Sequence, residues 1–191
     1  MKLALAVALA ALAGPAQAQE MRPQETVRLE QFDAALGQAL KRAMALGRRG
    51  DIDLVQEALE GPAIPALRTS LSGDWTCRTI KMGGDVPLVA YAPFQCRFTP
   101  DGDGFIFEKL TGSQLTRGRV DLRDGQMVYL GVGYVADVDP MDYTDLPEGD
   151  FDSGERQPEV ALVEQSDGDR ARLLFPLPTR ESVFDILHLT R

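Results

Sequence analysis

The feature that most constrains the fold of this chain is a change in hydrophobic period near Leu71. From this point apolar and polar residues alternate, which is the pattern of strands with one buried face. Turn signals separate eight such runs, at residues 73–82, 88–99, 103–110, 114–122, 126–136, 158–165, 169–177 and 182–190. Eight strands in hairpin order can close an up-and-down barrel. We therefore expect an antiparallel β-barrel domain over residues 71–191.

Before the barrel, the chain has a helical period. Between residues 25 and 47, apolar side chains recur three or four positions apart, at Leu29, Phe32, Leu36, Leu40, Ala43 and Leu46. We expect one helix there and a second, shorter helix that Asp51 caps and Gly61-Pro62 ends. Residues 19–70 thus form an N-terminal helical segment. The expected fold class is mainly β with N-terminal α, a short helical pair followed by an eight-stranded barrel.

The first 18 residues predict a signal peptide. Lys2 precedes an unbroken apolar run over residues 3–13, which is shorter than the roughly 20 apolar residues of a membrane span. Ala16-Gln17-Ala18 then supplies the small residues of a signal-peptidase site. We expect cleavage after Ala18 and a soluble periplasmic protein with no stable membrane insertion. The net charge of −9, without a basic cluster to offset it, argues against nucleic acid as a partner.

The chain has two cysteines, Cys77 and Cys96. In an exported protein an even pair of cysteines usually forms a bridge. Both lie in alternating runs, on the apolar face that Trp75 shares with Cys77. We therefore predict a disulfide that stabilises the fold by about 3 kcal/mol, as the chain-entropy argument gives for a loop of this length.

Four stretches carry a resemblance to a known family: 73–78 (Gly-Asp-Trp-Thr-Cys-Arg), 94–98 (Phe-x-Cys-Arg-Phe), 108–114 (Glu-Lys-Leu-Thr-Gly-Ser-Gln) and 181–187 (Glu-Ser-x-Phe-Asp-Ile-Leu). Together they resemble an uncharacterised family of exported bacterial proteins, a domain of unknown function. That resemblance implies no activity. The Gly-x-Trp at 73–75 is also similar to the opening strand of lipocalin- and avidin-like barrels, which implies a basic residue, here Arg191, over Trp75.

Little in the sequence favours an enzyme. The single histidine, His188, lies in an apolar run and is expected to be structural. The chain has no nucleophile elbow, zinc-protease motif or phosphate loop. A hydrolase that uses two carboxylates needs no motif, and Glu108 and Glu181 are the acids to test for that alternative. We expect no cofactor and no catalytic residue.

The segment 137–155 holds eight carboxylates and no Lys or Arg. Eight carboxylates could bind Ca²⁺, but their spacing does not fit an EF-hand loop. We predict a solvated acidic loop at one end of the barrel and no metal site.

The remaining candidates are ligand-binding residues. Polar side chains gather beside one turn, and aromatic side chains can line a cavity. The candidates are Trp75, Phe94, Phe105, Phe107, Lys109, Ser113, Gln114, Arg117, Tyr129 and Tyr134. Gly131 and Gly133 place no side chain inside the barrel at one strand, which favours a partly empty interior. We expect a non-enzymatic periplasmic binding or envelope-accessory protein that holds a small apolar or amphipathic ligand. The alternative is a protein-interaction module, such as a hydrolase inhibitor.

Overall fold

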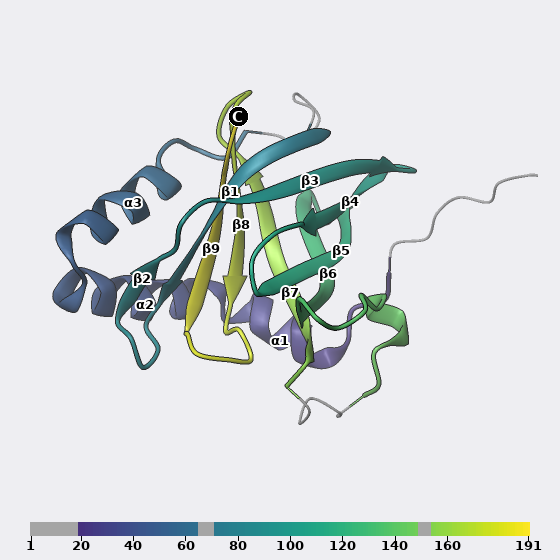
Figure 1. Ribbon diagram of the computed structural model, residues 1–191, viewed down its shortest axis with the longest axis horizontal. Coiled ribbons are helices and arrows are strands. Elements are labelled where there is room, and N and C mark those ends of the chain that lie inside the picture. Colours follow the sequence, from purple (N-terminus) through teal and green to yellow (C-terminus); the bar gives the residue numbers. More distant parts are fainter. Residues whose placement is uncertain (1–18, 65–70, 149–153) are drawn as a thin grey trace, which may run out of the picture.

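The computed structural model describes residues 19–64, 71–148 and 154–191, so the predicted signal peptide lies outside the described residues. A closed antiparallel barrel dominates the structure (Figure 1). Each barrel strand pairs with the next, and β1 also pairs with β9 to close the ring. The strands are β1 (Gly73–Met82), β3 (Phe94–Asp101), β4 (Gly104–Lys109), β5 (Gln114–Arg123), β6 (Gln126–Val135), β7 (Arg156–Gln165), β8 (Arg170–Pro176) and β9 (Phe184–Thr190). The predicted eight-stranded barrel is confirmed.

The predicted strand over 88–99 is wrong in one respect, because it is interrupted. It forms a short β2 (Leu88–Ala90) and then β3, and both pair with the same edge of β1. The interruption ends at Pro93, which has no N–H to donate to a ladder. The Tyr91 N–H still donates to the Thr79 carbonyl at 3.0 Å, which keeps the two pieces against β1.

The helices cover the outside of the barrel (Figure 1). The single helix expected over 25–47 is wrong, because the chain breaks at Gln31 into α1 (Pro23–Glu30) and α2 (Phe32–Leu46). The break allows α1 to run along β7 while α2 lies against β1, β8 and β9. The buried face of α2 is made of small residues, Ala35, Ala39 and Ala43, which allow a close approach to the outer face of the sheet. Leu46 is exposed.

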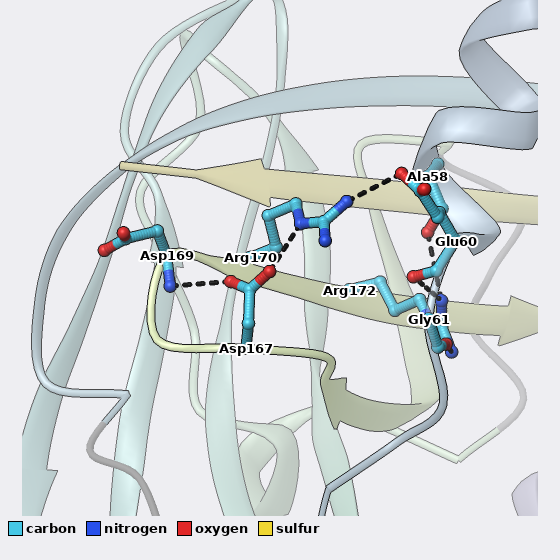
Figure 2. A network of polar contacts seen from close by, with 7 residues as sticks. All are labelled: Ala58, Glu60, Gly61, Asp167, Asp169, Arg170 and Arg172. Carbon is cyan, nitrogen blue, oxygen red and sulfur yellow. Dashed lines mark hydrogen bonds and ion pairs between the residues drawn. The ribbon is translucent and has the colours of Figure 1, made fainter.

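The third helix, α3 (Arg49–Leu59), is held at its C-terminal end by an arginine of the barrel. Arg172 points outward from β8 and donates to the carbonyls of Ala58, Glu60 and Gly61 at 3.1–3.3 Å (Figure 2). These contacts satisfy carbonyls that a helix end leaves unpaired. The expected cap at Asp51 is wrong: the helix begins two residues earlier, and Asp51 lies in its first turn.

One end of the barrel is filled with aromatic side chains. Ring centroids follow one another from Trp75 to Phe98 (6.4 Å), Phe107 (4.6 Å) and Tyr129 (5.8 Å). The expected contact of Arg191 is confirmed, since its guanidinium carbon lies 3.9 Å from the centroid of the Trp75 ring. We call this end, with its short turns, the closed end.

The predicted disulfide joins Cys77 and Cys96, whose Cα atoms are 5.9 Å apart. It crosses from β1 to β3 inside the barrel. Along β1 the inward positions run Trp75, Cys77, Thr79 and Lys81, so the bridge lies between the aromatic filling and the opposite, polar end.

Part of the acidic segment is fixed to the barrel rather than only solvated. Tyr143 and Leu146, at the 3₁₀ turn η2 (Tyr143–Asp145), are buried against the outer faces of β6 and β7. Arg22 donates to the carbonyls of both residues. Within the described ranges no group of three or more His, Cys, Asp or Glu side chains is placed to hold a metal ion. Residues 149–153 of this segment lie outside the described residues. No helix of the described chain has both the length and the hydrophobicity that a bilayer span requires.

Candidate functional site

A cavity of about 220 Å³ opens at the end of the barrel opposite Trp75. Described residues of the short β4–β5 loop and of the long β6–β7 and β8–β9 loops line it. For comparison, an apolar cavity of about 150 Å³ holds benzene, whereas drug-sized ligands occupy roughly 300–1,000 Å³. The cavity therefore fits a molecule somewhat larger than benzene. We call this end of the barrel the mouth.

The cavity separates the sequence-predicted residues into three groups. Five of them line it: Phe94, Lys109, Ser113, Gln114 and Tyr134. Four belong to the aromatic filling or pack against it instead: Trp75, Phe105, Phe107 and Tyr129. Arg117 lies on the outer face of β5, where it contacts Glu108 at 3.4 Å and Asp142 at 3.3 Å.

The two in-strand glycines do not leave empty space. A Cβ atom on Gly131 would overlap the Tyr129 hydroxyl, and one on Gly133 would overlap the Glu159 carboxylate. Each glycine therefore makes room for a large side chain from β6 or β7. The expectation that these glycines create the cavity is wrong, although Gly133 contributes to its wall.

Two lysines reach into the mouth, and both are engaged by the protein. Lys81 Nζ lies 2.7 Å from Glu181 Oε2 and 3.0 Å from Gln114 Oε1, so it joins the β8–β9 loop to the start of β5. Lys109 Nζ donates to the carbonyls of Thr111 and Gln114 and lies 3.8 Å from the centroid of the Phe94 ring. Burial lowers the pKa of Lys109 to about 8.

A buried hydrogen-bonded chain connects the aromatic filling to the cavity. The hydroxyls of Tyr129 and Thr116 are hydrogen-bonded to each other, and Thr116 Oγ1 donates to Glu159 Oε2 at 2.5 Å. Burial raises the pKa of Glu159, although the Thr116 hydrogen bond and the charges of Arg28 and Lys81 oppose the rise. Glu159 forms no direct ion pair with any residue in the described part of the chain.

Asp185 is the second unpaired carboxylate in the cavity. It begins the inward face of β9, where it pairs in register with Lys81 on β1 and Phe175 on β8. Its Oδ1 atom is enclosed and has no hydrogen-bond partner among the described residues. Burial raises the pKa of Asp185 to about 7, against the opposing effects of the Ser182 hydroxyl and the Lys81 charge. At neutral pH this carboxyl therefore exchanges readily between its charged and neutral forms.

The wall of the cavity is incomplete between β7 and β8. Their ladder covers only residues 162–165 and 171–174, although both strands continue toward the mouth. Arg28 of α1 fills the gap: its guanidinium donates to the Pro158 carbonyl on β7 at 3.0 Å and to the Pro176 carbonyl on β8 at 3.1 Å. The buried arginine thus replaces missing ladder bonds and also lines the cavity.

Sequence reasoning missed the charged residues of the site, Lys81, Glu159, Asp185 and Arg28. A signal was available for the first three, because they occupy the inward positions of their strands at the ends nearest the long loops. The hydrolase candidates lie elsewhere: Glu108 pairs with Arg117 on the outside of the barrel, and Glu181 is at the rim. His188 is buried on the outer face of β9, away from the cavity, and burial lowers its pKa.

Comparison with known proteins gives a family but no characterised relative. Neither the curated proteins nor the solved structures contain a match to this chain. The family described as "Domain of unknown function (DUF4893)" matches residues 17–189. This match confirms the expected resemblance to a family of unknown function. The chain therefore belongs to the DUF4893 family.

Proposed function

We propose that this protein is a non-enzymatic periplasmic binding protein that holds one small amphipathic molecule in the mouth of its barrel. The observation that carries the proposal is the cavity of about 220 Å³. Its wall combines apolar side chains, such as Phe175 and Leu187, with buried charged ones. Ligand sites commonly have this composition, with apolar walls and a few placed polar groups. The Cys77–Cys96 disulfide supports an oxidising compartment.

Blocking the cavity tests the proposal. Thr79 lies on β1 and lines the cavity, whereas Thr76 is exposed on the outer face of the same strand. Thr79→Phe should therefore fill the mouth, and Thr76→Phe is the matched control. An environment-sensitive apolar dye should bind the unmodified protein and Thr76→Phe with one-to-one stoichiometry, and amphiphiles should displace it. Thr79→Phe should bind it at least tenfold more weakly.

Equal dye binding by the two folded variants would contradict the proposed site. Thermal unfolding of both variants shows whether they are folded, because overpacking alone costs about 1–3 kcal/mol. Native mass spectrometry of protein purified from its own periplasm identifies the natural ligand.

A second candidate function is a carboxylate-dependent hydrolase, which one observation favours. Asp185 and Glu159 line one cavity, and burial raises the pKa of both. Carboxyl groups with raised pKa values in a cavity are candidate general acids. Chromogenic glycosides test this candidate: turnover that both Asp185→Asn and Glu159→Gln abolish would establish a hydrolase, and absence of turnover across the panel leaves the binding function.

A further inference from the structure

Three positive groups of the cavity, Lys81, Lys109 and Arg28, are already engaged by the protein, and a fourth, Arg180, lies in the loop between β8 and β9. Lys81 is bound by Glu181 and Gln114, and Lys109 is bound by two backbone carbonyls and the face of Phe94. Arg28 donates to two strand carbonyls. An anionic ligand would have to compete with these contacts.

Two of the negative groups of the cavity lack ion-pair partners of this kind. Glu181 has Lys81 as its partner, but Asp185 and Glu159 form no ion pair with any described residue. Glu159 has one oxygen held by Thr116. Asp185 Oδ1 has no partner at all within the described chain, although it is fully enclosed. A buried polar atom without a partner is uncommon and costs free energy until a donor reaches it.

The surroundings of these carboxylates suit an apolar body. Phe175 is the register partner of Asp185 on β8, and Leu187 follows Asp185 on the inward face of β9. Tyr134 and Ile186 also line the cavity. The terminal torsion of an aspartate is soft, so a small rotation can bring Oδ1 to face the cavity. The site thus presents an acceptor beside apolar walls.

We propose that the ligand carries a cationic hydrogen-bond donor, such as a primary ammonium group, on a small apolar body, and that Asp185 binds this group with Glu159 beside it. This inference rests on the proposed binding function and names its ligand class. A buried carboxylate and a ligand ammonium compensate each other's loss of water, which an alcohol of the same shape cannot do. The charged groups that face Asp185 are Lys81 from β1, Glu159 from β7, Glu181 from the loop before β9 and Arg28 from α1.

Three probes of one shape test the ligand class: benzylamine, benzyl alcohol and benzoate. Calorimetry with the full mature chain at pH 8 should show that benzylamine binds about tenfold or more tightly than benzyl alcohol, the factor expected for one hydrogen bond to a charged group. Benzoate should bind most weakly. Asp185→Asn should remove the preference for the amine and leave the affinity for the alcohol within about threefold. Asp74→Asn, which changes an exposed carboxylate on the outer face, should keep the preference.

The pH dependence adds a second readout. Protonation of Asp185 below about pH 7 should weaken benzylamine binding, while the affinity for benzyl alcohol stays level. Proton release on amine binding should appear as a dependence of the heat on the buffer at pH 7, and Asp185→Asn should lack it.

The outcomes separate this inference from the proposed function. If benzyl alcohol or benzoate binds as tightly as the amine, and Thr79→Phe blocks that binding, the cavity is a ligand site but the cationic class is wrong. Amine preference that persists in Asp185→Asn also overturns the inference. If none of the three probes binds the folded protein, both the inference and the binding function fail.

Discussion

The closed end and the mouth are built from the same eight strands but differ in what fills them. At the closed end, inward positions carry Trp75, Phe98 and Phe107, and each of these side chains is at most 1% exposed. At the mouth, the same inward alternation brings in Lys81, Glu159 and Asp185. The aromatic filling that stabilises the fold and the charged cavity therefore lie at opposite ends, with the disulfide between them. Changes at one end should therefore leave the other largely unaffected.

The largest expected effect is at the closed end. Trp75→Ala should lower the free energy of unfolding by about 3–5 kcal/mol, the usual cost of truncating a buried large aromatic. The variant also loses the indole hydrogen bond to the Leu71 carbonyl and the stacking of Arg191. Urea unfolding measures the loss. Val86→Ala, at an exposed turn position, is the control and should change stability by less than about 0.5 kcal/mol. A small loss for Trp75→Ala would mean that the closed end is not the main stabilising region.

The disulfide gives the next effect. The double variant Cys77→Ala/Cys96→Ala should lose about 3 kcal/mol, because the bridge closes a loop of 19 residues in sequence. Urea unfolding of the variant and of the reduced unmodified protein should agree. Since the bridge lies between the two ends, dye binding at the mouth should also weaken. Unchanged binding in the folded variant would show that the mouth keeps its shape without the bridge.

Arg28→Met should cost about 2–3 kcal/mol, because it leaves two strand carbonyls without their charged donor. The loss should be local to the mouth: amide exchange should accelerate at residues 156–160 and stay slow around Trp75. Arg42→Met, on the exposed side of α2, serves as the control. Uniformly faster exchange in both regions would argue that the two ends are not independent.

The last expected effect is a pH dependence at the mouth, which is confined to one pH window. Asp185 has an ordinary pKa of 3.8 and a pKa of about 7 in the folded protein. Between these values the folded chain keeps a proton that the unfolded chain has lost, so stability from the neutral carboxyl is complete below about pH 4 and is lost as pH rises to 7. Asp185→Asn should therefore gain stability relative to the unmodified protein across this window. Urea unfolding at pH 4 to 8 measures the difference in free energy of unfolding between the two proteins. If this difference does not grow with pH, the raised pKa of Asp185 is contradicted. For Asp74→Asn the stability difference from the unmodified protein should not grow between pH 5 and 8, because the hydrogen bond from Arg97 lowers the pKa of Asp74.

The alternating pattern predicted the strands well, because the alternation of inward apolar and outward polar residues can be recognised from neighbouring positions in the sequence. It placed the ends of β1 at Gly73 and Met82 correctly, and it placed Cys77 and Trp75 on the inward face. The break at Gln31 could not be predicted, because it follows from the directions in which α1 and α2 pack on the barrel.

The site was predicted only in part. The aromatic candidates were chosen by residue type alone. Trp75, Phe107 and Tyr129 were therefore predicted to line a cavity, whereas they belong to the aromatic filling of the barrel. Attention to charged residues at inward positions near the long loops would have found Lys81, Glu159 and Asp185. Arg28 has no local signal of this kind, because its partners are backbone carbonyls more than 120 residues away.

The contacts of Arg28 also constrain the order of assembly. They join the first helix to residues 130 and 148 positions later in the chain. Contacts of such long range are slow to form, since the intervening chain must be ordered first. In a chain that emerges from its N-terminus, α1 appears before β7 and β8 exist, so its docking belongs to the last steps of folding. Until then the seam between β7 and β8 stays unsealed, and the half-finished barrel exposes strand edges to its neighbours.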